Sequence, residues 1–223
     1  MKIGVVLSGC GVKDGSEIHE SVLTLLAISK LGAQAVCMAP DVMQADVINH
    51  LTGKPANEKR SVLAESARIA RGKIKSIKDV NPDELDALIF PGGFGAAKNL
   101  STFASDGARC KVEPNVQELA RKIHAQGKPI GALCISPAFI AKIFEGKSIR
   151  LTIGNDSETA KQIESMGQKH ETRTVREVCV DSQNRIVSTP AYMCDAQIAD
   201  IASGIERLVE TVISLIPQSA AKL

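Results

Sequence analysis

Cys134 is the residue whose surroundings best suit nucleophilic chemistry in this sequence. The apolar run at 130–133 is too short for a helix and follows a Lys-Pro pair, so it predicts a buried strand that ends at the cysteine. Pro137 suits the first turn of a helix, and apolar residues continue at helical spacing as far as Phe144. Such a strand-to-helix bend would lift the thiol out of the sheet at the positive end of a helix, which favours the thiolate. The alternative is a small cysteine that packs behind a strand, because free cysteine is among the most buried residue types.

Two carboxylates and a histidine lie at the start of another predicted helix. Ser16 ends the loop after the first strand and can cap this helix, which is expected at 18–31. Glu17, His19 and Glu20 fall in its first turn. The carboxylates could move a proton in catalysis, or they could simply favour the helix dipole. The 3.6-residue period of this helix is carried by its apolar residues Ile18, Val22, Leu25, Leu26, Ile28 and Leu31.

A glycine-rich turn, Pro91-Gly92-Gly93-Phe94-Gly95, follows the strand expected at 87–90. Glycine permits unusual backbone angles and close approach, so exposed N–H groups there could bind an oxyanion. An ordinary glycine turn is the alternative. The loop Ser8-Gly9-Cys10-Gly11 does not complete a dinucleotide-binding fingerprint, because Asp14 occupies the position of its third glycine.

These three features are expected at one edge of the sheet, because the ligand crevice of an open parallel sheet lies at the carboxyl ends of its strands. A thiolate, carboxylates that move a proton and backbone donors for a developing oxyanion form a nucleophilic site for a carbonyl compound. Their coincidence favours catalysis by Cys134 over simple packing.

The remaining pattern predicts an α/β chain, with an open, mainly parallel sheet covered by helices on both faces. Strands are expected at 2–7, 34–39, 87–90, 130–133 and 149–153, and a hairpin of 175–181 with 185–189 adds an antiparallel edge. Further helices are expected at 42–51, 61–69, 112–126, 138–146, 157–166 and 196–216. The stretch 96–110 is expected to be an irregular connection.

Length and composition exclude several classes of function. The 223 residues fit one domain, and the formal charge is +2 with both signs interspersed, so neither nucleic acid nor an anionic membrane surface is an expected partner. No apolar segment approaches the roughly 20 residues that cross a bilayer, and the short apolar start indicates a first strand and not a signal peptide. We therefore expect a soluble, cytoplasmic protein. The six cysteines lack the spacing of a metal site, so free thiols and no bound metal are expected.

Four motifs carry a family resemblance: Ser-Gly-Cys-Gly-Val at 8–12, Asp-Gly-Ser-Glu-Ile-His-Glu at 14–20, Pro-Gly-Gly-Phe-Gly-Ala-Ala-Lys-Asn-Leu at 91–100 and Thr-Pro-Ala-Tyr-Met at 189–193. They resemble the ElbB family, also called enhancing-lycopene-biosynthesis or isoprenoid-biosynthesis proteins with an amidotransferase-like domain, in the PfpI and deglycase superfamily. The resemblance covers nearly the whole chain. It implies a single domain over 1–223 with a flavodoxin-like, doubly wound fold of the class I glutamine amidotransferase type. It also implies a homodimer and a glyoxalase that turns glyoxal into glycolate without glutathione, metal or other cofactor.

The resemblance also implies roles for individual residues, with Cys134 as the nucleophile. In the superfamily a glutamate from the first loop hydrogen-bonds the cysteine, and the run Glu-Ser-Val at 20–22 matches that motif best. Glu20 is therefore preferred to Glu17 as the acid and base. The N–H groups of Gly92, Gly93 and Ile135 match the superfamily's oxyanion donors.

One departure from the superfamily concerns a histidine that many members carry after the nucleophile. This chain has no histidine between Cys134 and His170, although His19 could take that role. The departure argues against glutamine hydrolysis, because a thiol amidase usually needs a base to activate the thiol and to protonate the leaving amine. We therefore expect a small dicarbonyl substrate, glyoxal or methylglyoxal, and the Cys134 thiolate would add to one of its carbonyl carbons. The competing hypothesis is a sensor or interaction protein in which Cys134 is oxidised reversibly and a dimer surface conveys the change. Cys10 could then be its resolving partner, or it could be an incidental loop cysteine.

Overall fold

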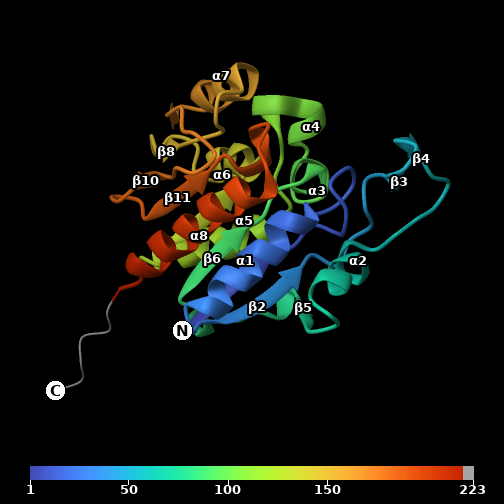
Figure 1. Cartoon of the computed structure of the whole chain (residues 1–223), viewed down its shortest axis with the longest axis horizontal. Helices are drawn as coiled ribbons and strands as arrows, with labels where there is room; N and C mark the ends of the chain where they lie inside the picture. Colours follow the sequence, from blue (N-terminus) through green and yellow to red (C-terminus); the bar gives the residue numbers. More distant parts are fainter. Residues whose placement is uncertain (218–223) are drawn as a thin grey trace.

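The computed structural model describes residues 1–217 and is built around one seven-stranded sheet (Figure 1). Residues 218–223 of the expected domain lie outside this range. The strands follow in the order β10-β11-β7-β6-β1-β2-β5, and each neighbouring pair is parallel except β10 with β11. The predicted α/β class with an antiparallel edge hairpin is thus confirmed. The strand bounds are β1 Lys2–Val6, β2 Gln34–Ala39, β5 Ile74–Ser76, β6 Ala87–Phe90, β7 Ile130–Leu133, β10 Cys179–Asp181 and β11 Ile186–Thr189.

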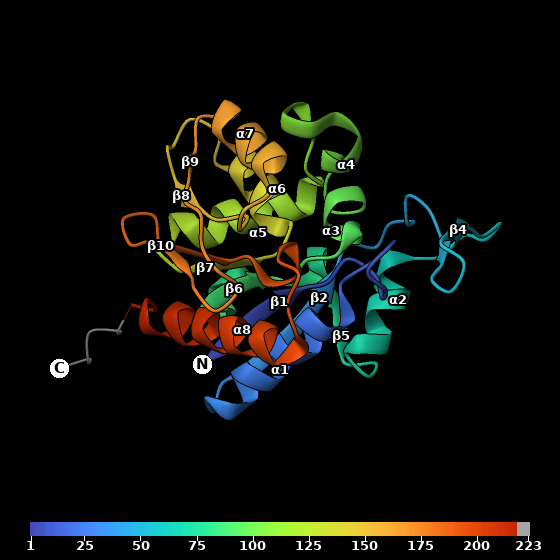
Figure 2. The same cartoon turned by 45° about the horizontal axis from the view of Figure 1, so that its top comes forward.

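Helices cover both faces of this sheet, as Figure 2 shows. The central strands are buried on both sides, because alternate side chains belong to different clusters: Leu88 and Phe90 of β6 pack in one, Ala87 and Ile89 in the other. The first cluster contains residues of α5 Pro114–Ala125, α6 Ser136–Ile143 and α7 Ser157–Ser165. The second contains residues of α1 Ile18–Lys30 and α8 Ile198–Ser214, and the partly buried Ile69 of α2 Val62–Ile69 packs against it.

The helix expected at 42–51 is wrong. Most of this stretch is irregular, and it leads into a small hairpin of β3 Ile48–Asn49 with β4 Lys54–Pro55 on an arm that extends from the body (Figure 1). Tertiary contacts decide this conformation: Asp14 Oδ2 accepts a hydrogen bond from the Ile48 N–H at 2.7 Å, and Lys98 Nζ lies 2.7 Å from Asp46 Oδ2. Such contacts override local helix propensity.

Three further expectations need correction. The connection at 96–110 contains helical turns, α3 Phe94–Lys98, α4 Phe103–Asp106 and η3 Gly107–Arg109. The strand expected at 149–153 is only β8 Arg150–Leu151, and it pairs with β9 Lys169–His170 in a separate two-stranded sheet. Strand β5 was not expected, because a run of three residues is too short to give a periodic signal. Single 3₁₀ turns complete the chain at η1 Ile77–Asp79, η2 Pro82–Glu84 and η4 Ala191–Met193.

The apolar stripe expected for α1 is only partly buried. Ile28 is buried, whereas Ile18, Val22 and Leu26 are exposed, and the other buried residues of the helix are Glu20, Ser21, Thr24 and Ala27. The apolar stripe and the core-facing stripe of this helix therefore overlap only in part. The core-facing stripe carries Glu20 toward the carboxyl ends of the central strands.

Three neighbouring strands, β1, β6 and β7, end at the same edge of the sheet. The loops that follow them contain Glu17, Gly92 and Cys134, respectively. Parallel strands in the sheet centre thus gather the three sequence features, as predicted. Within residues 1–217, no helix is both long and apolar enough to cross a lipid bilayer.

Candidate active site

Cys134 occupies the sharp bend between β7 and α6. Its backbone φ is 55°, which is unusual for a residue other than glycine, and its N–H donates to the Thr189 carbonyl at 3.0 Å. This geometry is that of a nucleophile elbow, in which a strained turn fixes the direction of the side chain. The N–H groups of Gly93 and Ile135 are directed at the sulfur, and the residue is only 7% exposed. The predicted bend is therefore present, and its thiol faces inward.

The Glu20 carboxyl lies beside this thiol. Glu20 is fully buried, its side chain is hydrogen-bonded to Cys134, and its Oε2 accepts the Gly92 N–H at 2.8 Å. The Tyr192 N–H reaches Oε1 at 3.3 Å. Burial is the main cause that raises the pKa of Glu20 to about 7, and the negative charge of Glu17 raises it further, whereas the backbone donors lower it. Glu20 can therefore hold or release a proton near neutral pH.

The expected low pKa of Cys134 is wrong. Burial raises the pKa of this thiol well above 9, the Glu20 charge raises it further, and the N–H groups of Gly93 and Ile135 only partly oppose the rise. The reason is that the loss of hydration acts on the whole thiolate charge, while the helix end supplies only partial charges. A thiolate at this position needs its proton to be taken by Glu20 at the same time.

Glycines make the contact between these two groups possible. A Cβ on Gly92 would lie 2.5 Å from the Cys134 Cβ and 2.8 Å from Glu20 Oε2, so a side chain there would separate them. Gly93 has φ 95°, and a Cβ on it would lie 2.3 Å from the Glu17 nitrogen. The Glu17 N–H also donates to the Gly92 carbonyl at 2.9 Å. The first loop and the glycine turn are thus locked together through their main chains, which fixes Glu20 against Cys134.

Glu17 is the N-cap of α1. Its Oε2 accepts the Glu20 N–H at 2.7 Å, so this carboxylate satisfies a free donor at the helix start. Ser16, the expected cap, instead accepts the Ser8 N–H at 2.8 Å and helps to fold the first loop. Of the two predicted carboxylates, Glu20 is the one that contacts the thiol. Glu17 contacts the main chain of Glu20, and its charge raises the pKa of the Glu20 carboxyl.

The Gly92 N–H does not serve as an oxyanion donor in this geometry, because it is already donated to Glu20. This corrects the expectation for Gly92. The N–H groups of Gly93 and Ile135 are directed at Cys134, and their role as oxyanion donors stays a prediction. Donors that stabilise a thiolate at this point would also stabilise an oxyanion formed on the carbon that the sulfur attacks.

His19 is exposed, and its Nδ1 lies 2.8 Å from the Tyr192 hydroxyl. Tyr192 was not predicted as a site residue. Its main chain donates to Glu20 and its ring lies 5.8 Å from the His19 ring, measured between centroids. Ala191, just before it, has φ 45° and is buried, so the turn that follows β11 is held in an unusual conformation. The sequence did contain one signal for Tyr192: it follows β11, which lies beside β7 in the sheet, so its loop must lie at the same edge as Cys134.

Cys10, the candidate resolving cysteine, and His170, which was not predicted to take part, have other neighbours. Cys10 lies near Glu65 and Arg68 of α2, which act on the pKa of its thiol, and both Cys10 and Cys134 are free thiols. His170, the first histidine after Cys134, accepts the Ile153 N–H with its Nε2 at 3.3 Å. Within residues 1–217, no three His, Cys, Asp or Glu side chains are grouped as metal ligands.

Comparison with known proteins agrees with this architecture. The human glutamine amidotransferase-like class 1 domain-containing protein 3, mitochondrial, is 46% identical over 224 residues, which cover 96% of this chain and 83% of the human protein. The crystal structure of an isoprenoid biosynthesis protein with amidotransferase-like domain from Ehrlichia chaffeensis is 34% identical, with a TM-score of 0.92 over 97% of this chain and 100% of that chain.

More distant likeness extends to the fold of glyoxalase III from Candida albicans, at 16% identity and a TM-score of 0.60 over 97% of this chain and 98% of that chain. The sequence pattern of the DJ-1/PfpI family matches residues 73–196, which include β6, the glycine turn, β7 and Cys134. Together with the human relative, this match shows that the chain belongs to the DJ-1/PfpI family.

Proposed function

We propose that this protein is a cofactor-independent glyoxalase that converts glyoxal or methylglyoxal to the 2-hydroxy acid through Cys134. One observation carries the proposal: a buried carboxyl group with a pKa of about 7 is hydrogen-bonded to the thiol. A thiol with a raised pKa cannot react alone, but a carboxylate beside it can take its proton as it attacks. An isomerising reaction of a dicarbonyl needs this same group to move a proton between two carbons.

The proposed reaction begins when Glu20 accepts the Cys134 proton and Sγ adds to one aldehyde carbon. The N–H groups of Gly93 and Ile135 stabilise the resulting alkoxide, which then takes the proton from Glu20. Glu20 next removes the proton from the sulfur-bearing carbon and passes it to the oxygen of the neighbouring carbon, which gives an enediol. Glu20 then takes the hydroxyl proton of the sulfur-bearing carbon and delivers it to the neighbouring carbon, so that the sulfur-bearing carbon becomes a thioester carbonyl. Water hydrolyses the thioester, releases the hydroxy acid and restores the thiol.

The burial of both groups limits the size of the substrate. Cys134 is 7% exposed and Glu20 is fully buried, so a two- or three-carbon aldehyde fits the approach better than a glycated protein side chain does. Glutamine hydrolysis remains disfavoured, because His170 is bonded to the main chain of Ile153 and Glu20 is the titratable group that acts most strongly on the thiol. The redox-sensor reading is weaker as well, because sensor thiols are accessible and have lowered pKa values.

The test is turnover of glyoxal by the purified protein, with glycolate measured as the product. Cys134→Ala should abolish it, and Glu20→Gln should reduce kcat by at least about a hundredfold, within the range for loss of a general acid and base. Glu17→Gln should keep most of the activity. Retained turnover in Cys134→Ala would refute the proposal, and formation of a Cys10–Cys134 disulfide under mild peroxide, without glyoxal turnover, would support the sensor.

Within the DJ-1/PfpI family we place the chain in the ElbB group. The supporting observation is the likeness to the Ehrlichia protein over nearly the full length of both chains, since that protein carries the ElbB group's other name. A cytoplasmic location stays a prediction, and the human relative is described as mitochondrial. A fusion of a fluorescent protein to the C-terminus, viewed in cells of the source organism, would test it.

A further inference from the structure

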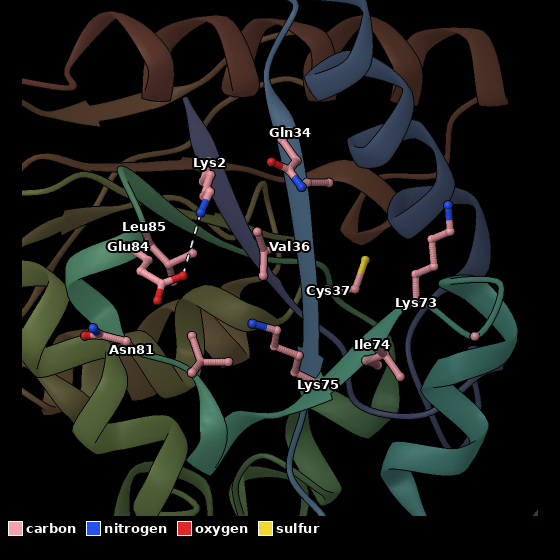
Figure 3. Close-up of a pocket in the computed structure, with 13 residues that line it drawn as sticks. Lys2, Gln34, Val36, Cys37, Lys73, Ile74, Lys75, Asn81, Glu84 and Leu85 are labelled. Atoms are coloured by element: carbon pink, nitrogen blue, oxygen red, sulfur yellow. Dashed lines mark ion pairs between the residues drawn. The ribbon is translucent and has the colours of Figure 1, made fainter.

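A hollow of about 400 Å³ lies at the amino end of β2, away from the edge that carries Cys134 (Figure 3). Strand β5 pairs with β2 only from Ile74, opposite Cys37, to Ser76, opposite Ala39. Among residues 1–217, the first three residues of β2, Gln34, Ala35 and Val36, therefore have β1 on one side and no strand of the sheet on the other. The hollow occupies the place that a further length of strand would fill.

The backbone of β2 offers hydrogen-bonding groups to this hollow. The Gln34 N–H donates to the Met1 carbonyl at 2.9 Å, and the Leu7 N–H donates to the Met38 carbonyl at 2.8 Å, so even-numbered residues of β2 bond toward β1. In a parallel ladder the alternate residues turn their N–H and C=O groups to the opposite side. Ala35, which lines the hollow, therefore directs both groups into it. Backbone groups at an open strand edge are a template for pairing with another chain.

The walls of the hollow come from both faces of the sheet. Val36, Val80 and Leu85 belong to one hydrophobic cluster, whereas Cys37 and Ile74 belong to the other, and in Figure 3 Val36 and Cys37 project to opposite sides of β2. The hollow therefore lies at the edge of the sheet, in line with its strands, and not on one of its faces. An extended peptide placed there would direct successive side chains to the two walls in turn, which is how strand addition selects a sequence.

The rim of the hollow is positively charged. It carries Lys2, Lys73 and Lys75 against the single carboxylate of Glu84. The Lys2 Nζ lies 3.7 Å from Glu84 Oε2, and both side chains are about half exposed, so this pair is weak. Within residues 1–217, Lys73 and Lys75 form no ion pair. Lysines also protect sheet edges against uncontrolled pairing, so these charges reject neutral and basic strands and favour an acidic one.

We propose that the open edge of β2 binds an extended, acidic peptide segment of another protein by strand addition. About three residues of the segment pair with Gln34–Val36, and its acidic side chains contact the rim lysines. The site lies at the opposite end of the strands from Cys134, so peptide binding leaves glyoxal turnover unchanged. The inference stands independently of the proposed activity.

The probe is a fluorescein-labelled peptide of about six residues with alternating Glu and Val. Fluorescence anisotropy against the full chain should show binding that weakens with salt. The double substitution Lys73→Glu with Lys75→Glu should weaken binding by at least about tenfold and should favour the matching Lys and Val peptide. The control Lys161→Glu, on the exposed surface of α7, should leave binding unchanged.

A peptide N-methylated at alternate amides separates strand addition from simple charge attraction, because it keeps the charges and loses the backbone donors. This peptide should bind at least about tenfold more weakly. Equal binding of the methylated and unmethylated peptides overturns the proposal, as does the absence of binding by the acidic peptide. Self-association that is lost in the Lys73 and Lys75 variant, without peptide binding, overturns it in favour of a second copy of the chain.

Discussion

Cys134 and Glu20 form one titrating unit, because both are buried, hydrogen-bonded to each other and acidic. Two negative charges at this separation are strongly unfavourable in a dry site, so the pair carries at most one charge around neutral pH. The form with thiol and carboxylate and the form with thiolate and carboxylic acid contain the same number of protons. The reactive form is thus reached without a change of total charge, once a single proton has left the pair near pH 7.

The raised pKa of Glu20 predicts a pH-dependent stability. Since the native pKa is about 7 and the ordinary value is 4.5, the native state holds this proton more tightly than the unfolded state. The free energy of unfolding should therefore fall as the pH rises from 4.5 to 7, by about 3 kcal/mol from this group, and stay lower above it. Glu20→Gln should remove this component. Urea unfolding at pH 5 and pH 8 measures it, with Glu118→Gln on the exposed face of α5 as the control; an unchanged difference in Glu20→Gln would contradict the assignment.

Gly92 should tolerate no side chain, because an alanine Cβ would lie within 3 Å of both Cys134 and Glu20. Gly92→Ala is expected to lower glyoxal turnover by about a hundredfold or more, since a displacement of about 1 Å at a reacting group has that effect. The control is Gly167→Ala, where φ is 79° and no atom lies within 4 Å of the new Cβ. That variant should lose about 1 kcal/mol of stability and keep its activity. Full activity in Gly92→Ala would show that the contact between thiol and carboxyl is not needed.

At the scale of elements, helix α1 carries both its N-cap residue, Glu17, and the proposed acid and base, Glu20. Glu17 caps the helix and its charge raises the pKa of Glu20. In Glu17→Gln the amide oxygen can still accept the Glu20 N–H, but the charge is gone, so the pKa of Glu20 should fall. The midpoint of the rise in kcat/KM with pH should then move below that of the wild type. Glu113→Gln, at the N-cap of α5, is the matched control and should leave the midpoint in place; an upward shift in Glu17→Gln would contradict the argument.

The same helix shows what sequence can and cannot predict about an element. Its existence and its bounds followed from periodicity, yet three of its predicted apolar residues, Ile18, Val22 and Leu26, are exposed. Glu20, Thr24, Ala27 and Ile28 share the buried face, and a carboxylate in such a stripe is a costly placement that only a site justifies. Apolar spacing alone indicates Ile18, Val22 and Leu26 and passes over the buried polar residues. The burial that raises the pKa values of Glu20 and Cys134 could not be predicted from the sequence either, because it depends on which chain segments cover Cys134.

At the scale of the whole molecule, long apolar strands and their Gly or Pro ends predicted the central sheet and the edge at which its loops meet. The elements that sequence missed are held by distant partners: the arm at 42–61 by Asp14 and Lys98, and β5 by its pairing with β2. Residues so far apart in the chain leave no local pattern. The hollow beside β2 follows from the short length of β5, so it too could not be predicted.

The exposed stripe of α1 supports the predicted homodimer. Ile18, Val22 and Leu26 are 42%, 47% and 45% exposed and lie four residues apart, so they line one side of the helix. An exposed apolar row of this kind is typical of an interaction site. We propose that two copies of the chain meet along this row.

Val22→Glu should therefore convert the dimer to a monomer in sedimentation equilibrium, because it would bury a charge without a partner at the centre of the contact. Leu51→Glu is the matched control: Leu51 is 95% exposed at the tip of the arm, far from α1 along the chain, and its substitution should leave the mass unchanged. The variant of Lys73 and Lys75 should also remain dimeric, since the β2 edge is a separate surface. Dissociation by Leu51→Glu in place of Val22→Glu would move the interface to the arm, and a wild-type chain that is monomeric at all concentrations would leave the row on α1 as exposed surface.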